Sequence, residues 1–161
     1  MITLIDNALL DQVCAEAAAN PRRRKNRNLH PTDDHPAHRL LNAMQPDSYI
    51  PPHRHLDPNK DETFIVLRGL LGLVLFDDAG GIVRCVKVGA GGTAIGVDIP
   101  HGTWHTAIAL EADTVFLEAK AGPYLPFSAA EKAPWAPAEN TAEVVPYLTM
   151  VKALVARLCT T

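Results

Sequence analysis

Two histidines that stand two positions apart, in the run PPHRHLDPNKDE at residues 51–62, are the strongest chemical signal in the sequence. Successive side chains of a strand point to opposite faces, so a strand here would point His53 and His55 to one face and Arg54 to the other. The two prolines before them cannot donate hydrogen bonds to a neighbouring strand, which favours an edge or a bend near an open rim. Two imidazoles on one face of such a rim are a candidate pair of metal ligands.

A carboxylate and a third histidine follow this pair along the chain. Glu62 opens the next apolar run, where a hairpin would return it beside the two histidines, and Asp61 is its rival for the same role. His105 follows the turn IPHG, whose own His101 is expected to face solvent. The joint pattern predicts that three imidazoles and one carboxylate meet in an antiparallel barrel.

Such a set mixes borderline nitrogen donors with one hard oxygen, which suits one divalent transition metal ion such as Fe, Mn, Ni, Co or Zn. Four protein ligands leave coordination positions open, which is typical of a catalytic site rather than a closed structural one. Ligating histidines must be neutral, so metal release is expected as the pH falls below about 6.

The elements that would position these residues are short runs rich in Val, Ile, Leu and Thr. Turn-forming residues separate them, and the run DDAGG at residues 77–81 is the clearest hairpin signal. Short strands without intervening helices predict an all-β antiparallel sandwich or barrel. The expected strands cover residues 48–56, 62–68, 70–77, 82–88, 92–98, 103–110 and 113–120.

Helical patterns flank the strands. Apolar residues recur on one helical face over residues 6–19 and again from about 146 to 158. We therefore expect a single domain over residues 1–161. Its parts would be a helix and an irregular arm (1–46), the barrel core (47–120), and a proline-rich wrapping segment with a C-terminal helix (121–161).

The basic run RRRKNR at residues 22–27 has two interpretations. The simpler one is a solvated linker, and the alternative is a rim that binds phosphate or carboxylate. The formal net charge of −3 and the pI near 6.1 give no support to binding of nucleic acid or of a membrane surface. No run approaches the roughly 18 apolar residues of a membrane helix.

The three cysteines are far apart and form no CxxC pair. An odd number at such spacing favours free thiols in a reducing compartment over a disulfide framework. The first residues lack the charged and apolar runs of a signal peptide. From these features we expect a cytoplasmic protein.

The histidine motifs resemble a known superfamily. P-H-x-H followed by E-x6-G, and then P-x-G-x2-H, resemble the two signature motifs of the cupins, which are small jelly-roll β-barrels that bind one divalent metal. The resemblance implies a cupin-type antiparallel barrel with flanking helices, and it implies that the metal ligands are His53, His55, Glu62 and His105.

A narrower resemblance covers residues 27–124. The run RNLHPTDDHPAHRLLNAMQPDSYIPPHRHLDPNKDETFIVLRG, together with FLEAKAGPY, resembles the WbuC family of cupin-fold metalloproteins, which are small bacterial proteins often linked to O-antigen polysaccharide genes. This resemblance implies a set of candidate pocket residues: Arg27, Asn28, His30, Arg39, Glu118, Lys120 and Tyr124.

Two functions follow from these resemblances. The first is a metal-dependent enzyme, of isomerase, epimerase or dioxygenase type, that acts on a small polar substrate such as a sugar or sugar nucleotide. Its general acid or base would be Glu118, Lys120, Tyr124 or His30. The second is a non-catalytic barrel in which the metal anchors a small ligand. Cupin habit and the apolar C-terminal helix favour a homodimer in either case.

Overall fold

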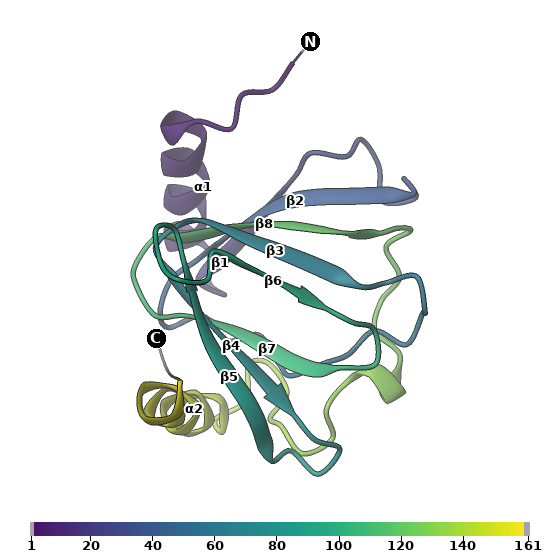
Figure 1. Ribbon diagram of the computed structural model, residues 1–161, viewed down its shortest axis with the longest axis vertical. Helices are drawn as coiled ribbons and strands as arrows, with labels where there is room; N and C mark the ends of the chain where they lie inside the picture. Colours follow the sequence, from purple (N-terminus) through teal and green to yellow (C-terminus); the bar gives the residue numbers. More distant parts are fainter. Residues whose placement is uncertain (1, 160–161) are drawn as a thin grey trace.

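Two antiparallel sheets with a helix at each end make up the part of the chain that the computed structural model describes, residues 2–159 (Figure 1). The larger sheet has the strand order β1-β2-β8-β3-β6, and the smaller sheet has the order β5-β4-β7. The elements in chain order are α1 (Asn7–Ala19), β1 (Arg24–Asn28), β2 (Ala37–Met44), β3 (Glu62–Arg68), β4 (Leu70–Phe76), β5 (Ile82–Gly89), β6 (Gly96–Ile99), β7 (Trp104–Ala109), β8 (Thr114–Ala121), the short 3-10 helix η1 (Ala129–Glu131) and α2 (Val144–Leu158).

The main core lies between the two sheets. Phe64 of β3 and Phe116 of β8 are buried against Leu71 and Leu73 of β4 and Val88 of β5. Inward and outward side chains alternate along these strands, as a two-layer β structure requires. The expected mainly β, antiparallel fold with flanking helices is confirmed.

Each helix covers the outer face of one sheet. Leu10, Val13 and Ala17 of α1 pack on Leu41 of β2 and Val115 of β8. In α2, the residues Leu148, Val151 and Val155 pack against the smaller sheet. Asp6 caps α1, since its side chain accepts a hydrogen bond from the backbone N–H of Leu9 at 3.0 Å. Both helices were expected from the apolar periodicity, and both lie within two residues of the expected bounds.

The prediction of an irregular arm before residue 47 is wrong in part. Residues 24–28 and 37–44 form β1 and β2, and β2 pairs with β8 inside the larger sheet. The inward face of β1 is polar, with Asn26 and Asn28 on it, and Asn42 of β2 faces the same cavity. The alternation between apolar and polar residues, by which a strand is recognised in a sequence, is therefore weak in β1 and β2.

The strand expected at residues 48–56 is also wrong. In this segment His53 alone pairs, in isolated bridges with His105 and Lys132. Pro51 and Pro52 have no backbone N–H to give to a ladder. The other six expected strands are confirmed as β3 to β8, with their ends moved by at most four residues.

The cysteines contradict the expectation of free thiols. Cys85 of β5 and Cys159, directly after α2, form a disulfide across a sequence separation of 74 residues. The packing of α2 on the smaller sheet brings the Cα atoms of the two cysteines to 5.2 Å from each other. No local sequence pattern indicates a contact between residues so far apart in the chain. Cys14 stays free and buried. No helix of residues 2–159 has the length and apolarity needed to cross a membrane.

Reduction of this disulfide is expected to lower the free energy of unfolding by about 2–4 kcal/mol, because the cross-link restricts the unfolded chain. Urea unfolding with and without a reductant measures the difference. A Cys85→Ser variant should match the reduced wild type and should no longer respond to reductant. Equal unfolding curves for oxidised and reduced wild type would contradict the expectation.

Candidate metal centre

The backbone places three histidines and one glutamate at one end of the space between the sheets. The N–H of His53 donates to the carbonyl of His105 at 3.0 Å, and the N–H of His105 donates back to His53 at 2.9 Å. The N–H of Gly102 donates to the carbonyl of His55 at 2.6 Å, which ties the turn before β7 to the same segment. Glu62 is the first residue of β3. These contacts join the two motifs that the sequence keeps about forty residues apart.

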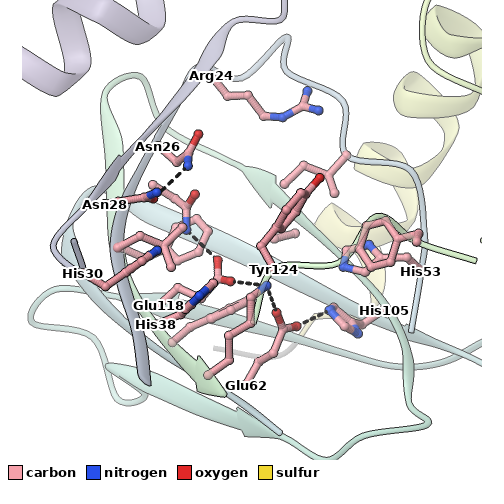
Figure 2. A pocket seen from close by; sticks show the side chains of 18 of the residues that line it. Arg24, Asn26, Asn28, His30, His38, His53, Glu62, His105, Glu118 and Tyr124 are labelled. Atoms are coloured by element: carbon pink, nitrogen blue, oxygen red, sulfur yellow. Dashed lines mark hydrogen bonds and ion pairs between the residues drawn. The ribbon is translucent and has the colours of Figure 1, made fainter. Parts of the chain in front are cut away.

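The ligand atoms of His53, His55 and Glu62 all lie within 4.8 Å of one another. The Nε2 atom of His55 lies 3.0 Å from one Glu62 carboxylate oxygen, Oε1. His105 lies just outside this group of three, but its Nε2 atom is 3.0 Å from the other Glu62 oxygen, Oε2 (Figure 2). A single ion bound by these four residues would need only small side-chain movements.

Backbone carbonyls orient two of the imidazoles. The Nδ1 atom of His53 lies 3.0 Å from the carbonyl of Pro51, and the Nδ1 atom of His105 lies 2.9 Å from the carbonyl of Thr103. A carbonyl can only accept, so each Nδ1 carries the proton and each Nε2 keeps a free lone pair. This arrangement is the usual one for histidines that bind a metal through Nε2.

Two buried polar atoms of this group lack a hydrogen bond. Among the described residues, Glu62 Oε2 and His105 Nε2 are both buried and unpaired, although they are only 3.0 Å apart. A carboxylate oxygen and an imidazole lone pair that face each other without a shared proton repel, and a cation between them removes the repulsion. The donor set therefore fits a bound divalent ion.

Burial and contacts set the charge states of the group. Burial lowers the pKa of His53 to about 3, and the neighbouring His105 adds to this effect. For Glu62, burial alone would raise the pKa, but the close contacts with His105 and His55 and the charge of Lys120 hold it well below its usual value. His53 is thus neutral and Glu62 is ionised, which are the forms that a metal needs.

Chelator-treated protein is expected to lose stability as the pH falls from the usual His53 value of 6.5 toward about 3. Across that range the unfolded chain binds a proton that the folded protein excludes, so the free energy of unfolding rises with pH, by at most about 1.4 kcal/mol per pH unit for one group. A His53→Gln variant should show a flatter dependence in urea unfolding, and an equal slope would contradict the assignment.

A second polar group lies directly behind Glu62. The register of β3 and β8 sets Lys120 opposite Glu62, and the Lys120 ammonium contacts Glu62 Oε1 at 2.8 Å and Glu118 Oε1 at 2.6 Å. Asn42 of β2 donates to the remaining Glu118 oxygen at 2.6 Å. Burial would lower the pKa of Lys120, but the carboxylates of Glu118 and Glu62 outweigh burial and raise it. Burial raises the pKa of Glu118.

These side chains line a cavity of about 500 Å³. Figure 2 shows it as a cup, with the residues of β1 along one wall, Glu62 and His105 at the base, and Tyr124 across the front. Phe127, from the segment after β8, lies against His53 with 4.6 Å between the ring centroids. The segment after β8 therefore passes beside the metal-ligand group.

The structure brings together most of the residues that the sequence suggested. His53, Glu62, His105, Asn28, His30, Glu118, Lys120 and Tyr124 all line the cavity, and His55 contacts Glu62 at its edge. Tyr124 is 60% exposed. His101 faces solvent and pairs with Asp61. Asp61 is therefore directed away from the candidate metal ligands.

Arg27 and Arg39 do not reach the cavity. Arg27 points out of the opposite face of β1 and pairs with Glu16 of α1 at 2.8 Å, and Arg39 is exposed on β2. Each stands one position from a residue that does face inward, Asn28 and His38 respectively. A shift of one position along a strand moves a side chain to the other face.

The polar cavity residues outside the pocket set expected from the sequence include Arg22, Arg24, Asn26, His38 and Asn42. Strand alternation counted from Asn28 would have found Arg24 and Asn26, had β1 been recognised as a strand. His38 stacks on His30 with ring centroids 4.0 Å apart, and nothing in its local sequence separates it from a surface histidine.

Comparisons with known proteins agree with this fold. A family model described as "Domain of unknown function (DUF6016)" matches residues 5–88. No curated protein matches the chain. An uncharacterized conserved protein with a double-stranded beta-helix domain from Klebsiella pneumoniae is 16% identical, with a TM-score of 0.56, over 82% of this chain and 100% of that one.

Two further solved structures match less of the chain. KdgF from Halomonas sp. is 19% identical, with a TM-score of 0.51, over 66% of this chain and 85% of that one. The protein TT1209 from Thermus thermophilus is 13% identical, with a TM-score of 0.52, over 74% of this chain and 98% of that one. Likeness at these identities shows the double-stranded β-helix of cupins and nothing about activity.

Proposed function

The chain belongs to the family described as "Domain of unknown function (DUF6016)", and we propose that it is a divalent-metal-binding cupin that acts on a small polar substrate such as a sugar or sugar nucleotide. One observation carries the proposal. The ligand atoms of His53, His55 and Glu62 converge beside a cavity of about 500 Å³, with an unpaired buried nitrogen of His105 next to them. The cavity has room for a small molecule.

In this proposal His53, His55, Glu62 and His105 hold the ion. A bound ion of the Fe, Mn, Ni, Co or Zn type would supply Lewis acidity toward a substrate oxygen. The open side of the group faces the cavity, where His53, Glu62 and His105 form part of the wall. A substrate oxygen would approach from that side.

Glu118 is the strongest candidate for moving a proton. Burial raises its pKa above the usual value, so the Glu118 carboxylate is a better proton acceptor than an exposed one. Lys120 keeps Glu118 and Glu62 at fixed positions. His30 and Tyr124 line the same cavity and supply further groups that can exchange a proton with a hydroxyl.

One observation favours the second candidate function, a non-catalytic binding barrel. Both oxygens of Glu118 are engaged, one by Lys120 and one by Asn42, and the Lys120 ammonium is held between two carboxylates. Side chains whose hydrogen-bonding atoms are all occupied can position a ligand without exchanging a proton with it.

Other parts of the proposal rest on the sequence. They are the WbuC resemblance with its link to polysaccharide metabolism, a cytoplasmic location and a homodimer. Exposed apolar residues on the outer face of α2, Val145 and Met150 among them, support pairing of two copies. Light scattering on the purified protein measures the mass that decides this point.

Proton NMR of metal-loaded protein in D2O with D-galactose, D-galacturonate and UDP-galactose distinguishes the two functions. An isomerase or epimerase would exchange a carbon-bound proton of one sugar with solvent or convert it to a second sugar. Glu118→Gln should then abolish that change, while the metal content and the sugar affinity stay near those of the wild type. Binding of a sugar by the wild type without any conversion or exchange would favour the binding barrel.

A further inference from the structure

The run RRRKNR becomes two different surfaces once it is folded. Strand alternation sends Lys25 and Arg27 to one side of β1, and Arg23, just before the strand, also lies outside the cavity. There Arg23 pairs with Asp47 at 3.0 Å and Arg27 pairs with Glu16 at 2.8 Å. The alternate residues Arg22 and Arg24 line the cavity instead. The run is therefore neither a solvated linker nor a uniform basic rim.

The residues of this segment that face the cavity form a polar wall, with cationic side chains at one end and amide side chains after them. Figure 2 shows the wall running from Arg24 through Asn26 and Asn28 to His30, near Glu118, and Arg22 also lines the cavity. Two cations thus lie at one end of the cavity and the metal-ligand group lies at the other, with amide side chains between them. Asn26 donates to the side-chain oxygen of Asn28 at 3.2 Å, which leaves the Asn26 oxygen and the Asn28 amide hydrogens free for a ligand.

At the cationic end of the cavity, Arg24 has N–H donors that no protein group among the described residues uses. Arg24 is held by Glu139 at 2.5 Å and by the carbonyl of Tyr49 at 2.7 Å, which fixes the plane of its guanidinium. A guanidinium has five N–H donors, so several remain for a ligand. Among residues 2–159, Arg22 has no ion pair. Glu139 balances one of the two charges, and the net charge at this end is positive.

The acidic residues of the cavity lie elsewhere. Glu62 and Glu118 share Lys120 at the base. Asp33 lies beside His38, whose Nε2 atom is 3.1 Å from the Asp33 carbonyl. An anionic group of a ligand would therefore be attracted to the arginine end, away from the carboxylates of the base.

We propose that Arg22 and Arg24 form an anion subsite, and that the ligand of this protein is an anionic sugar. Its carboxylate or phosphate faces the two arginines, and its hydroxyls face the amides of Asn26 and Asn28. This inference rests on the proposed function for the other end of the ligand, which a metal held by the histidines and Glu62 would bind. It names the class of small molecule that the cavity selects.

Calorimetric titration with three sugars that differ only at one carbon tests the charge requirement: D-galactose, D-galacturonate and D-galactose 6-phosphate. The wild type should bind the two anionic sugars about 10- to 100-fold more tightly than galactose, as expected for charge-assisted hydrogen bonds. Comparison of the two anionic sugars shows whether carboxylate or phosphate fits better. Equal affinity for all three, or binding of none, would overturn the inference.

Arg24→Gln should reduce the preference for the anionic sugars to about threefold or less, and Arg22→Gln should reduce it in part. Arg22 is exposed, so that variant keeps its fold and remains informative if Arg24→Gln proves unstable. Lys25→Gln is the matched control, because it removes the same charge from the other face of the same strand and should leave the preference unchanged. An equal loss in Lys25→Gln would mean that only the general charge matters, against the subsite.

Metal content, measured on each variant, separates this inference from the proposed function. The arginine variants should keep the metal content of the wild type, since neither arginine contacts a histidine of the centre. If the protein holds no metal but still prefers the anionic sugars, the proposed function fails and the subsite stands. If it holds metal without that preference, the subsite fails and the proposed function stands.

Discussion

A Lys120→Met variant is expected to be less stable than the wild type by about 3–5 kcal/mol, because removing one partner of a buried ion pair leaves the other charge uncompensated. The Lys120 ammonium contacts Glu62 at 2.8 Å and Glu118 at 2.6 Å, and Glu62 and Glu118 are 2% and 8% exposed. Without the ammonium the two carboxylates would face each other in a poorly solvated site. Urea unfolding of chelator-treated protein at neutral pH measures the loss.

Two comparisons make this prediction specific. A Lys25→Met variant removes an exposed ammonium from β1 and should change the free energy of unfolding by less than about 0.5 kcal/mol. The double variant Lys120→Met/Glu118→Gln should recover part of the loss, since only one buried charge remains. A single Lys120→Met variant as stable as Lys25→Met would show that the three charged groups are not coupled.

The second large effect is expected at His105. The structure leaves His105 Nε2 buried and unpaired, 3.0 Å from Glu62 Oε2, but outside the tight group of His53, His55 and Glu62. Loss of an outer partner of a metal site costs about 10- to 100-fold in metal affinity. If His105 is itself a ligand, as the motif resemblance implies, His105→Ala should cost more than about 100-fold.

Competition between the protein and a chelating dye for Zn(II) and for Ni(II) gives the affinities. His101→Ala serves as the control, because this histidine stands in the preceding turn, is exposed, and pairs with Asp61. It should leave both affinities unchanged. A loss of less than about tenfold in His105→Ala would remove His105 from the centre altogether.

The strands from Glu62 to Ala121 could be predicted because they face the apolar core. Their Val, Ile and Leu side chains alternate between turn residues, and the turn at residues 77–81 closes as expected, with the N–H of Asp77 donating to Gly81 at 2.9 Å. β1 and β2 could not be predicted by the same signal. Polar residues that face the cavity, such as Asn26 and Asn28 of β1 and Asn42 of β2, interrupt the apolar pattern that would have revealed these strands.

The candidate ligands could be read from spacing, but the groups around them could not. HxH, Glu62 and His105 stand at fixed offsets in the sequence, whereas the contact of Lys120 with Glu62 depends on the register of β3 and β8. The disulfide of Cys85 and Cys159 likewise depends on where α2 packs. Strand register and helix packing bring together residues that are far apart in the sequence. These contacts could therefore not be predicted from local sequence patterns.

Elemental analysis of the protein, purified without chelator or affinity metal, tests the central claim most directly. Wild type is compared with His53→Ala/His55→Ala, and with His35→Ala/His101→Ala, which removes two histidines that do not line the cavity. We expect about one equivalent of a transition metal in the wild type and in the control, and little in the first variant. The metal centre would be contradicted if none of the three holds metal after reconstitution, or if His53→Ala/His55→Ala holds as much as the wild type.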